Sequence, residues 1–157
     1  MEEERIADLL VKHHLKVATA ESCTGGLIGH TITNVPGSSE YYGGGIISYS
    51  NEMKMNFLGV SKQTLMEHGA VSRQTAAEMA EGIRRAAGVD IGIATTGIAG
   101  PGGGTAEKPV GLVYIAISTE GGTEVERHLF DGSRHENKEQ ACRAALSLLL
   151  NHLEKHD

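Results

Sequence analysis

The sequence predicts one α/β domain over residues 1–157, a three-layer α/β/α sandwich around a mixed, mostly parallel sheet of about five to six strands. Short apolar runs typical of buried strands alternate with segments in which apolar residues recur at helical spacing. Two of the runs are separated only by Glu120-Gly121-Gly122-Thr123, which predicts a β-hairpin and therefore an antiparallel pair. A chain of 157 residues is long enough for one sizeable core.

The first fifty residues predict two helices and two strands in alternation. Helical spacing of apolar residues indicates a helix over residues 2–14, and the apolar run 16–20 is typical of a buried strand. A second helix is expected over residues 27–33, because Pro36-Gly37-Ser38-Ser39 breaks it. Residues 44–50 then predict a second strand.

Three helices are expected next, each after a residue whose side chain commonly caps a helix start. Asn51 is expected to cap a helix over residues 52–58, and Ser61 a short helix that ends at His68. Ser72 is expected to cap a longer helix with an apolar inner face, made of Ala76, Met79, Ala80 and Ile83.

The remainder predicts a strand, a long loop, the hairpin and a closing helix. Residues 91–96 form the third expected strand, and residues 97–109 form a loop with five glycines and two prolines. The hairpin strands are expected over residues 111–118 and 124–130. A final helix is expected to end near Leu153, with inward-facing alanines and leucines.

Charge and composition exclude several classes of function. The net charge is −6, from 14 Lys and Arg against 20 Asp and Glu, and no dense basic cluster appears, so we expect no nucleic-acid partner. The apolar runs are too short for a membrane span, and the acidic start has no secretory signal. The two cysteines form no disulfide framework or zinc knuckle. We therefore expect a cytoplasmic protein with no membrane partner.

The most informative stretch is Ala20-Glu21-Ser22-Cys23-Thr24-Gly25-Gly26, at the expected turn from the first strand into the second helix. A nucleophile can project there from the sheet edge, while free N–H groups at the helix start face a developing negative charge. Ser22 is one candidate nucleophile, and it needs a base. Cys23 is the rival, because a thiol at a helix N-terminus has a lowered pKa. The simpler interpretation of Cys23 is a small buried core residue.

Lys54 is the candidate base for Ser22. It lies one turn into the helix after the second strand, and neighbouring strands end side by side. Its pKa would have to fall by about two to three units from about 10.4. Tyr49 could lie between Ser22 and Lys54 and relay a proton or fix the ammonium. The alternative is a solvated Lys54 and a Tyr49 that belongs to the core.

The eight histidines show no comparable pattern beside a carboxylate. His152 and His156 have the spacing of a metal-binding pair, but they lie on a terminal turn that we expect to fray. No His-Glu-x-x-His set appears either. We therefore expect no metal and no cofactor.

The loop after the third strand, from Thr96 and Gly97 through Gly100 and Gly102, can present N–H groups to a phosphate or a carbonyl oxygen. It lacks the Gly-Lys-Ser/Thr ending of a P-loop, and a structural crossover is the alternative. Arg134 begins a predicted helix, where the helix dipole disfavours a cation. It either faces an anionic ligand or is a surface arginine.

These motifs together resemble the CinA C-terminal domain family, whose members include stand-alone nicotinamide mononucleotide deamidases. The resemblance covers nearly the whole chain, and several independent motifs occur in one order. They are Thr19-Ala20-Glu21-Ser22-Cys23-Thr24-Gly25-Gly26, Pro36-Gly37-Ser38-Ser39, Ser48-Tyr49-Ser50-Asn51-Glu52-x-Lys54, His68-Gly69-Ala70-Val71-Ser72, Thr96-Gly97-Ile98-Ala99-Gly100-Pro101 and Lys108-Pro109-Val110-Gly111.

The resemblance implies hydrolysis of the carboxamide of nicotinamide mononucleotide, a small-molecule substrate, to nicotinate mononucleotide and ammonia without a metal or cofactor. Ser22 would be the nucleophile, Lys54 the base and Tyr49 their companion. The residues implied to hold the oxyanion or the substrate are Thr24, Gly25, Gly26, Thr96 and Gly97. A geometric argument of our own adds the phosphate, which we place against Gly100, Gly102 and Arg134. We also expect a homodimer or a higher homo-oligomer.

Two departures from the family pattern qualify this expectation. Asn137-Lys138 stands where the family usually has an Ile-Arg pair. Lysine keeps the charge but loses the fork that grips an anion in two places, so affinity or the dimer contact is expected to differ. The N-terminal domain often fused in the family, with its pyrophosphatase activity, is not expected here. A non-catalytic nucleotide-binding module and a Cys23-dependent amidase are the alternative functions.

Overall fold

Five strands form one mixed sheet in the order β2-β1-β3-β4-β5 in the computed structural model, which describes all of residues 1–157. Strands β1 (Val17–Glu21), β2 (Tyr42–Ile47) and β3 (Ile91–Gly97) are parallel to one another. Strand β4 (Leu112–Thr119) pairs antiparallel with β3 and with β5 (Gly122–Leu129). Only β4 therefore runs against the other strands, and the predicted mixed, mostly parallel sheet is confirmed.

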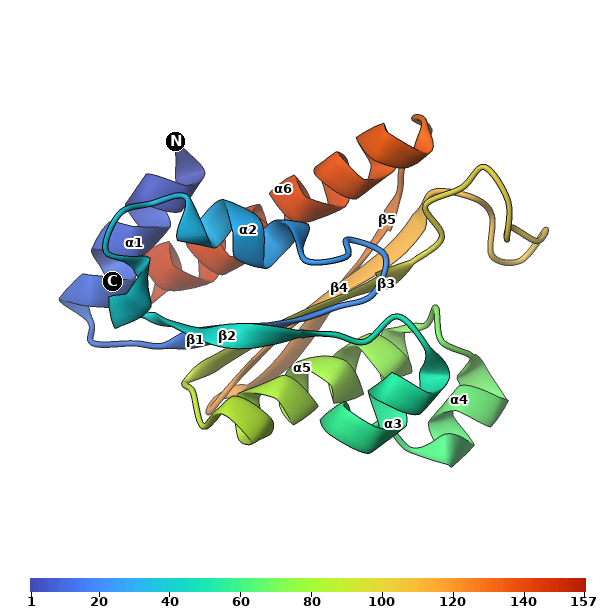
Figure 1. Ribbon diagram of the computed structural model, residues 1–157, viewed down its shortest axis with the longest axis horizontal. Coiled ribbons are helices and arrows are strands. Elements are labelled where there is room, and N and C mark those ends of the chain that lie inside the picture. The colour runs from blue at the N-terminus through green and yellow to red at the C-terminus, as the bar shows by residue number, and fades with distance from the viewer.

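Helices cover both faces of the sheet, which confirms the predicted three-layer sandwich (Figure 1). One layer contains α1 (Glu2–Lys12), α2 (Leu27–Thr33) and α6 (Arg134–Lys155). The other layer contains α3 (Asn51–Leu58), α4 (Lys62–His68) and α5 (Arg73–Ala87). A short 3-10 helix, η1 (Ser38–Glu40), precedes β2.

The two sheet faces carry side chains of different size. The face beneath α1, α2 and α6 is built from larger aliphatic residues, among them Val17, Ile91, Ile93, Val113, Ile115 and Ile117. The opposite face presents mainly alanines to α5: Ala18, Ala20, Ala94 and Ala116. Small residues allow neighbouring elements to approach closely. Helix α5 lies close to the end of α3 at Gly82, where an added Cβ would lie 1.8 Å from the carbonyl oxygen of Leu58. Helix α3 is therefore held tightly on α5.

The predicted elements are present, with boundaries close to those expected, and the prediction of the α3 cap was wrong. Ser50 rather than Asn51 caps α3, because its Oγ accepts a hydrogen bond of 3.1 Å from the Met53 N–H. Helix α6 ends at Lys155, close to the expected end near Leu153, and the terminal turn that we expected to fray is helical up to that residue. Its end is held by Asp157, which bonds to side chains of α1 and the turn that follows it. Neither α6 nor any other helix combines the length and the apolar content that crossing a membrane needs.

Candidate active site

The carboxyl ends of three parallel strands meet at one edge of the sheet. The register pairs Glu21 at the end of β1 with Ile47 of β2 on one side and Thr95 of β3 on the other. The Ser22 N–H continues this ladder with a hydrogen bond of 3.0 Å to the Thr95 carbonyl. A cavity of about 220 Å³ opens at this edge, lined by Ser22, Cys23, Tyr49, Asn51, Lys54, Ala70, Val71, Thr96, Gly97 and Ala99.

Lys54 enters this cavity from α3 and reaches Ser22. Its Nζ donates to the Ser22 Oγ at 3.1 Å and to the carbonyl oxygens of Ser48 at 2.8 Å and Tyr49 at 3.3 Å. The side chain is only 1 % exposed, and no carboxylate lies within ion-pairing distance. Burial lowers the pKa of the Lys54 ammonium, because a low-dielectric site disfavours its charge.

The three contacts of Lys54 also decide where its lone pair faces. The two carbonyl oxygens can only accept, so they require two N–H groups. A neutral amine has two N–H groups and one lone pair. Once Lys54 loses a proton, its lone pair is therefore left for the hydroxyl of Ser22, which is the arrangement that a general base requires. The simpler alternative, a Lys54 side chain exposed to solvent, was wrong because this side chain is buried.

Cys23 lies beside Ser22 and is not poised as a thiolate. Burial raises the pKa of its thiol to about 12, and the charge of Glu21 adds to that effect, although Lys54 and Lys138 act in the opposite direction. The expected lowering by the helix start was wrong for this physical reason. Cys23 instead belongs to the apolar cluster under α2 and α6, as its simpler interpretation predicted.

Glu21 is a buried residue of this site that the sequence analysis did not assign. Its carboxylate accepts hydrogen bonds from the N–H groups of Ile28 at 2.8 Å and Gly29 at 2.9 Å. It also accepts from the Thr24 Oγ1 at 2.8 Å. The backbone N–H groups of Ile28 and Gly29 in the first turn of α2 are therefore already hydrogen-bonded to the Glu21 carboxylate. An acidic residue between a buried strand and a helix start was the signal for this role.

The Ser22 loop still presents unpaired backbone donors. The N–H groups of Cys23, Thr24 and Gly26 donate to no acceptor of the chain, whereas the Gly25 N–H donates to the Ser22 carbonyl at 3.1 Å. The hydroxyl of Thr24 is buried between Glu21 and Thr95, and Thr24 does not line this cavity. Among the residues predicted to hold an oxyanion, Thr24 and Gly26 can therefore contribute through their backbone.

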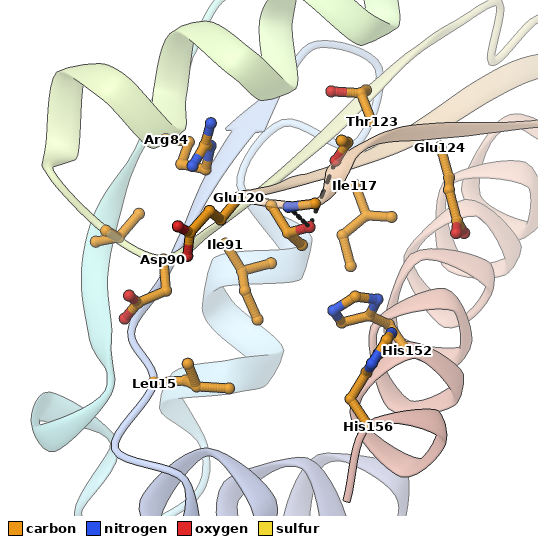
Figure 2. Close-up of a pocket in the computed structure, with 14 residues that line it drawn as sticks. Leu15, Arg84, Asp90, Ile91, Ile117, Glu120, Thr123, Glu124, His152 and His156 are labelled. Carbon is orange, nitrogen blue, oxygen red and sulfur yellow. Dashed lines mark hydrogen bonds between the residues drawn. The ribbon is translucent and has the colours of Figure 1, made fainter.

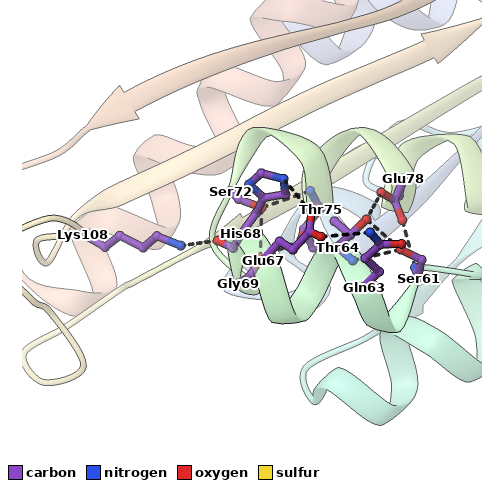
Figure 3. Close-up of polar contacts among 10 residues, drawn as sticks. All are labelled: Ser61, Gln63, Thr64, Glu67, His68, Gly69, Ser72, Thr75, Glu78 and Lys108. Carbon is purple, nitrogen blue, oxygen red and sulfur yellow. Dashed lines mark hydrogen bonds and ion pairs between the residues drawn. The ribbon is translucent and has the colours of Figure 1, made fainter.

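The opposite wall of the cavity is the connection between α4 and α5, which a polar network fixes (Figure 3). The Gly69 carbonyl accepts from Ser72 Oγ at 2.9 Å and from Thr75 Oγ1 at 2.7 Å. Lys108 donates from the glycine-rich loop to the His68 carbonyl. The Thr96 Oγ1 donates to the Ala70 carbonyl at 2.7 Å. The Thr96 hydroxyl therefore holds this wall in place.

Tyr49 and Arg134 meet at the mouth of the cavity. The Tyr49 side chain is 62 % exposed, and its hydroxyl accepts a 3.0 Å hydrogen bond from Arg134. Arg134 also donates to the Gly100 carbonyl at 2.7 Å. The expected position of the phenol between Ser22 and Lys54 was wrong, because only the backbone carbonyl of Tyr49 contacts Lys54. Tyr49 is not a core residue either.

The two remaining predicted glycines have different surroundings. A Cβ on Gly97 would lie 2.7 Å from the Leu112 carbonyl oxygen, so this glycine allows β3 and β4 to pair at their ends. Gly102 is exposed on the outer part of the loop, and a Cβ there would meet no atom within 4 Å. Only Gly97 lines the cavity.

Comparison with known proteins identifies the family. The family model described as the CinA C-terminal domain matches residues 1–153. The chain belongs to the CinA C-terminal domain family. The resemblance predicted from the sequence motifs is thereby confirmed.

Relatives within the CinA family carry names that refer to competence and damage. A provisionally named competence-damage inducible protein of Moorella thermoacetica is 57 % identical over 141 residues, which are 90 % of this chain and 34 % of the relative. A protein of the same name from Clostridioides difficile is 51 % identical over 98 % of this chain and 37 % of its own length. The chain thus spans about a third of the length of these curated relatives.

Solved structures agree over almost the whole chain. The competence damage-inducible protein A of Klebsiella pneumoniae has a TM-score of 0.94 at 37 % identity, covering 98 % of this chain and 95 % of that chain. A competence/damage inducible protein from Agrobacterium tumefaciens has a TM-score of 0.87 at 44 % identity, covering 96 % and 95 %. The CinA fold of this chain is therefore established.

The pair Asn137-Lys138, which we expected to depart from the family pattern, lies near the cavity mouth. Asn137 is buried and donates to the Ala99 carbonyl at 2.9 Å, while its Oδ1 accepts from the Gly132 N–H at 3.0 Å. It therefore ties the glycine-rich loop to the start of α6. The Lys138 Nζ lies 3.7 Å from the position that a Cβ would take on Gly25, in the loop that carries Ser22.

A larger cavity of this CinA domain lies at the opposite end of the sheet (Figure 2). It has a volume of about 680 Å³ and is bounded by the β4–β5 turn, the start of β3 and the end of α6. The rings of His152 and His156 lie 4.6 Å apart on its wall, but no group of three metal-ligating side chains forms anywhere in the structure. It contains no nucleophile beside a base, so the smaller cavity is the candidate active site.

Proposed function

We propose that this CinA domain hydrolyses the carboxamide of nicotinamide mononucleotide to nicotinate mononucleotide and ammonia. The observation that carries the proposal is the 3.1 Å contact between Lys54 Nζ and Ser22 Oγ at a buried position where Lys54 has no carboxylate partner. A serine activated by a neutral amine suits acyl transfer. The substrate comes from the family resemblance, and the site supplies the chemistry.

The reaction follows from the contacts of these two side chains. Ser22 Oγ attacks the amide carbon while Lys54 takes the hydroxyl proton, and a tetrahedral oxyanion forms. The unpaired N–H groups of Cys23, Thr24 and Gly26 are the donors available to that oxyanion. Protonated Lys54 then gives its proton to the departing nitrogen, and the C–N bond breaks. Water, deprotonated by Lys54, hydrolyses the acyl ester and restores Ser22.

The size of the cavity limits which part of the substrate it holds. Its volume of about 220 Å³ is below the roughly 300–1,000 Å³ usual for complete small-molecule sites, so it accommodates the pyridine carboxamide. The exposed ring of Tyr49 at the mouth is placed to contact the cationic pyridinium face. The ribose and the phosphate then extend over the rim, where Arg134 and the Gly100–Gly102 segment lie.

Removing either member of the Ser22–Lys54 pair tests the proposed reaction. Ser22→Ala and Lys54→Ala should each lower ammonia release from nicotinamide mononucleotide by about 10³-fold or more, because the nucleophile or its base is lost. Release is measured with and without a chelator, and equal rates are expected because the proposed chemistry needs no metal. Circular dichroism checks that both variants fold. Substantial turnover by either folded variant would remove the pair from the mechanism.

A Cys23→Ala protein separates this mechanism from the thiol alternative. Because burial keeps the Cys23 thiol protonated, the variant should release ammonia at close to the parent rate. Loss of activity in a folded Cys23→Ala protein would favour the Cys23-dependent amidase. Binding of the mononucleotide without any ammonia over hours would favour a non-catalytic binding module.

A further inference from the structure

We propose that Lys138 and Arg134 together form a phosphate-binding site on the rim of the Ser22 cavity, and that Lys138 selects phosphorylated substrates. The identity of the nucleotide rests on the proposed function. The cationic site itself follows from the positions and contacts of the two side chains.

Lys138 reaches across from α6 to the loop that carries Ser22. Its ammonium lies 3.7 Å from where a Cβ on Gly25 would be, so it stands directly over that loop. Lys138 is half-buried, and its ammonium has neither a hydrogen-bond acceptor nor a carboxylate within ion-pairing distance. Gly25 has a φ of +61° and no side chain, which leaves the space beside the ammonium open.

Arg134 supplies the second cation one helical turn earlier. Residues at positions i and i+4 lie on the same side of a helix, with Cβ atoms roughly 5–6 Å apart. Two of the five guanidinium N–H groups of Arg134 are engaged by Gly100 and Tyr49, which leaves three for a ligand. Those two bonds also orient the guanidinium at the cavity mouth.

No neighbouring carboxylate forms an ion pair with either of these two cations. The acidic residues of the same helical turns are used elsewhere, since Glu136 closes the capping box with Ser133 and Glu139 pairs with His135 at 2.9 Å. Two like charges at i and i+4 repel each other, and the dipole of the helix start disfavours Arg134, the first residue of α6. An unfavourable placement in a chain of net charge −6 indicates that an external anion completes the site.

The proposed substrate and the size of the cavity together indicate which anion would lie on the rim. The pocket beside Ser22 and Lys54 accommodates the pyridine carboxamide, so the charged end of a mononucleotide must lie on the rim. Arg134 stands on the rim beside Tyr49 and Gly100, and Lys138 stands over Gly25. A phosphate monoester placed between them meets the fork of Arg134 and the point charge of Lys138. An unphosphorylated nucleoside would lack both contacts.

The test uses calorimetric titration in a Ser22→Ala background, in which bound substrate is not consumed. We expect nicotinamide mononucleotide to bind more tightly than nicotinamide riboside, and inorganic phosphate to compete with it. Lys138→Met should weaken mononucleotide binding by about tenfold or more, the loss expected for one charge-assisted hydrogen bond. Riboside binding should stay unchanged in Lys138→Met, and Lys138→Arg should restore mononucleotide affinity. Mononucleotide affinity should fall more steeply with salt when Lys138 is present than in the Lys138→Met protein.

Lys62→Met is the matched control, because it removes one exposed lysine charge from α4 without touching the rim. Equal mononucleotide affinity in the Lys138→Met and Lys62→Met proteins overturns the inference even if the parent releases ammonia. Failure of the parent to bind either the mononucleotide or inorganic phosphate also overturns it. Binding that depends on Lys138 in a protein that releases no ammonia keeps the phosphate site and removes the proposed function.

Discussion

Lys54 is a buried amine whose neighbours are two carbonyl oxygens and one hydroxyl. An ordinary lysine is a poor base near pH 7, because its pKa of about 10.4 leaves almost every molecule protonated. Burial without a carboxylate partner lowers the pKa of Lys54 and so reduces that obstacle. The same burial costs stability whenever the amine is charged. Catalytic competence and a stability cost therefore have one physical cause at this residue.

This shared cause predicts a particular dependence on pH. Ammonia release should rise with pH as Lys54 deprotonates, with a midpoint below the ordinary lysine pKa. For stability, a lowered folded-state pKa makes a contribution that is fully present above about 10.4 and lost as pH falls toward the folded value. The parent should therefore gain unfolding free energy with rising pH in that window.

Urea unfolding of the parent and of Lys54→Met at several pH values tests the stability part of this prediction. Other groups titrate equally in both proteins, so the difference between their unfolding free energies isolates Lys54. We expect this difference to move in favour of the parent as pH rises. A difference that does not change with pH would show that the Lys54 pKa is the same in the folded and unfolded states.

Residue types and spacing made Ser22 and Lys54 candidate partners, because strand ends of a parallel sheet lie level, and the family resemblance assigned them as nucleophile and base. The same information could not give the direction of the Tyr49 side chain. Its hydroxyl bonds to Arg134, which is distant in sequence, and no local pattern encodes that contact. The role of Glu21 was missed for a related reason, since its partners Ile28 and Gly29 become neighbours only when α2 forms.

At the scale of elements, the position of Lys54 depends on how closely α3 packs on α5. Gly82 makes this contact possible, since any side chain there would collide with the Leu58 backbone at the end of α3. The start of α3 is fixed by the Ser50 cap. The sequence predicted both helices, whereas the choice of Ser50 over Asn51 depended on where the backbone turns after β2. Such a one-residue difference is typical of helix starts.

Gly82→Ala should therefore reduce both stability and activity. Alanine normally favours a helix by about 1 kcal/mol over glycine, but its Cβ would lie 1.8 Å from the Leu58 carbonyl oxygen, and backbone atoms cannot rotate away. We expect a loss of about 1–3 kcal/mol in unfolding free energy. Ammonia release should fall with it, because α3 carries Lys54.

Gly121→Ala is the matched control for this substitution. A Cβ on Gly121 would meet nothing nearer than 3.6 Å, so the β4–β5 turn should accept it with little change. Chemical unfolding and the ammonia assay are run on both variants. If Gly82→Ala is as stable as the control, the close packing of α3 on α5 described above is wrong.

At the scale of the whole molecule, the site draws on segments from Ser22 to Arg134, so most of the chain must fold before the cavity exists. Helices α1 and α6 tie the two ends of the chain together. Arg143 donates to both carboxylate oxygens of Glu3, at 2.8 Å and 3.2 Å. These contacts connect parts of the chain that lie far from the cavity.

The homo-oligomer expected from the resemblance stays a prediction, which sedimentation can test.

Arg143→Met should lower the melting temperature by at most about 2–4 °C, because Arg143 is half-exposed and such ion pairs contribute about 1 kcal/mol or less. The Arg143 guanidinium lowers the pKa of Glu3, so the contribution is fully present above the ordinary glutamate pKa of about 4.3 and lost as pH falls toward the folded value. The difference between parent and variant should shrink in acid.

Calorimetric melts at neutral and acidic pH measure this difference, and Arg143→Lys keeps the charge as a comparison. Turnover should be the same in all three proteins, since neither Glu3 nor Arg143 lines the Ser22 cavity. A fall in turnover without a fall in melting temperature would mean that the pair influences the active site directly.

The carboxyl-terminal Asp157 bonds to Lys12 and His13 at the end of α1, on the side of the molecule away from the Ser22 loop (Figure 1). A polypeptide attached after Asp157 would therefore emerge remote from the substrate entrance. An affinity handle placed there can anchor the enzyme to a bead or a sensor surface with its entrance facing solution. Immobilised turnover and ligand titration then become practical on one preparation.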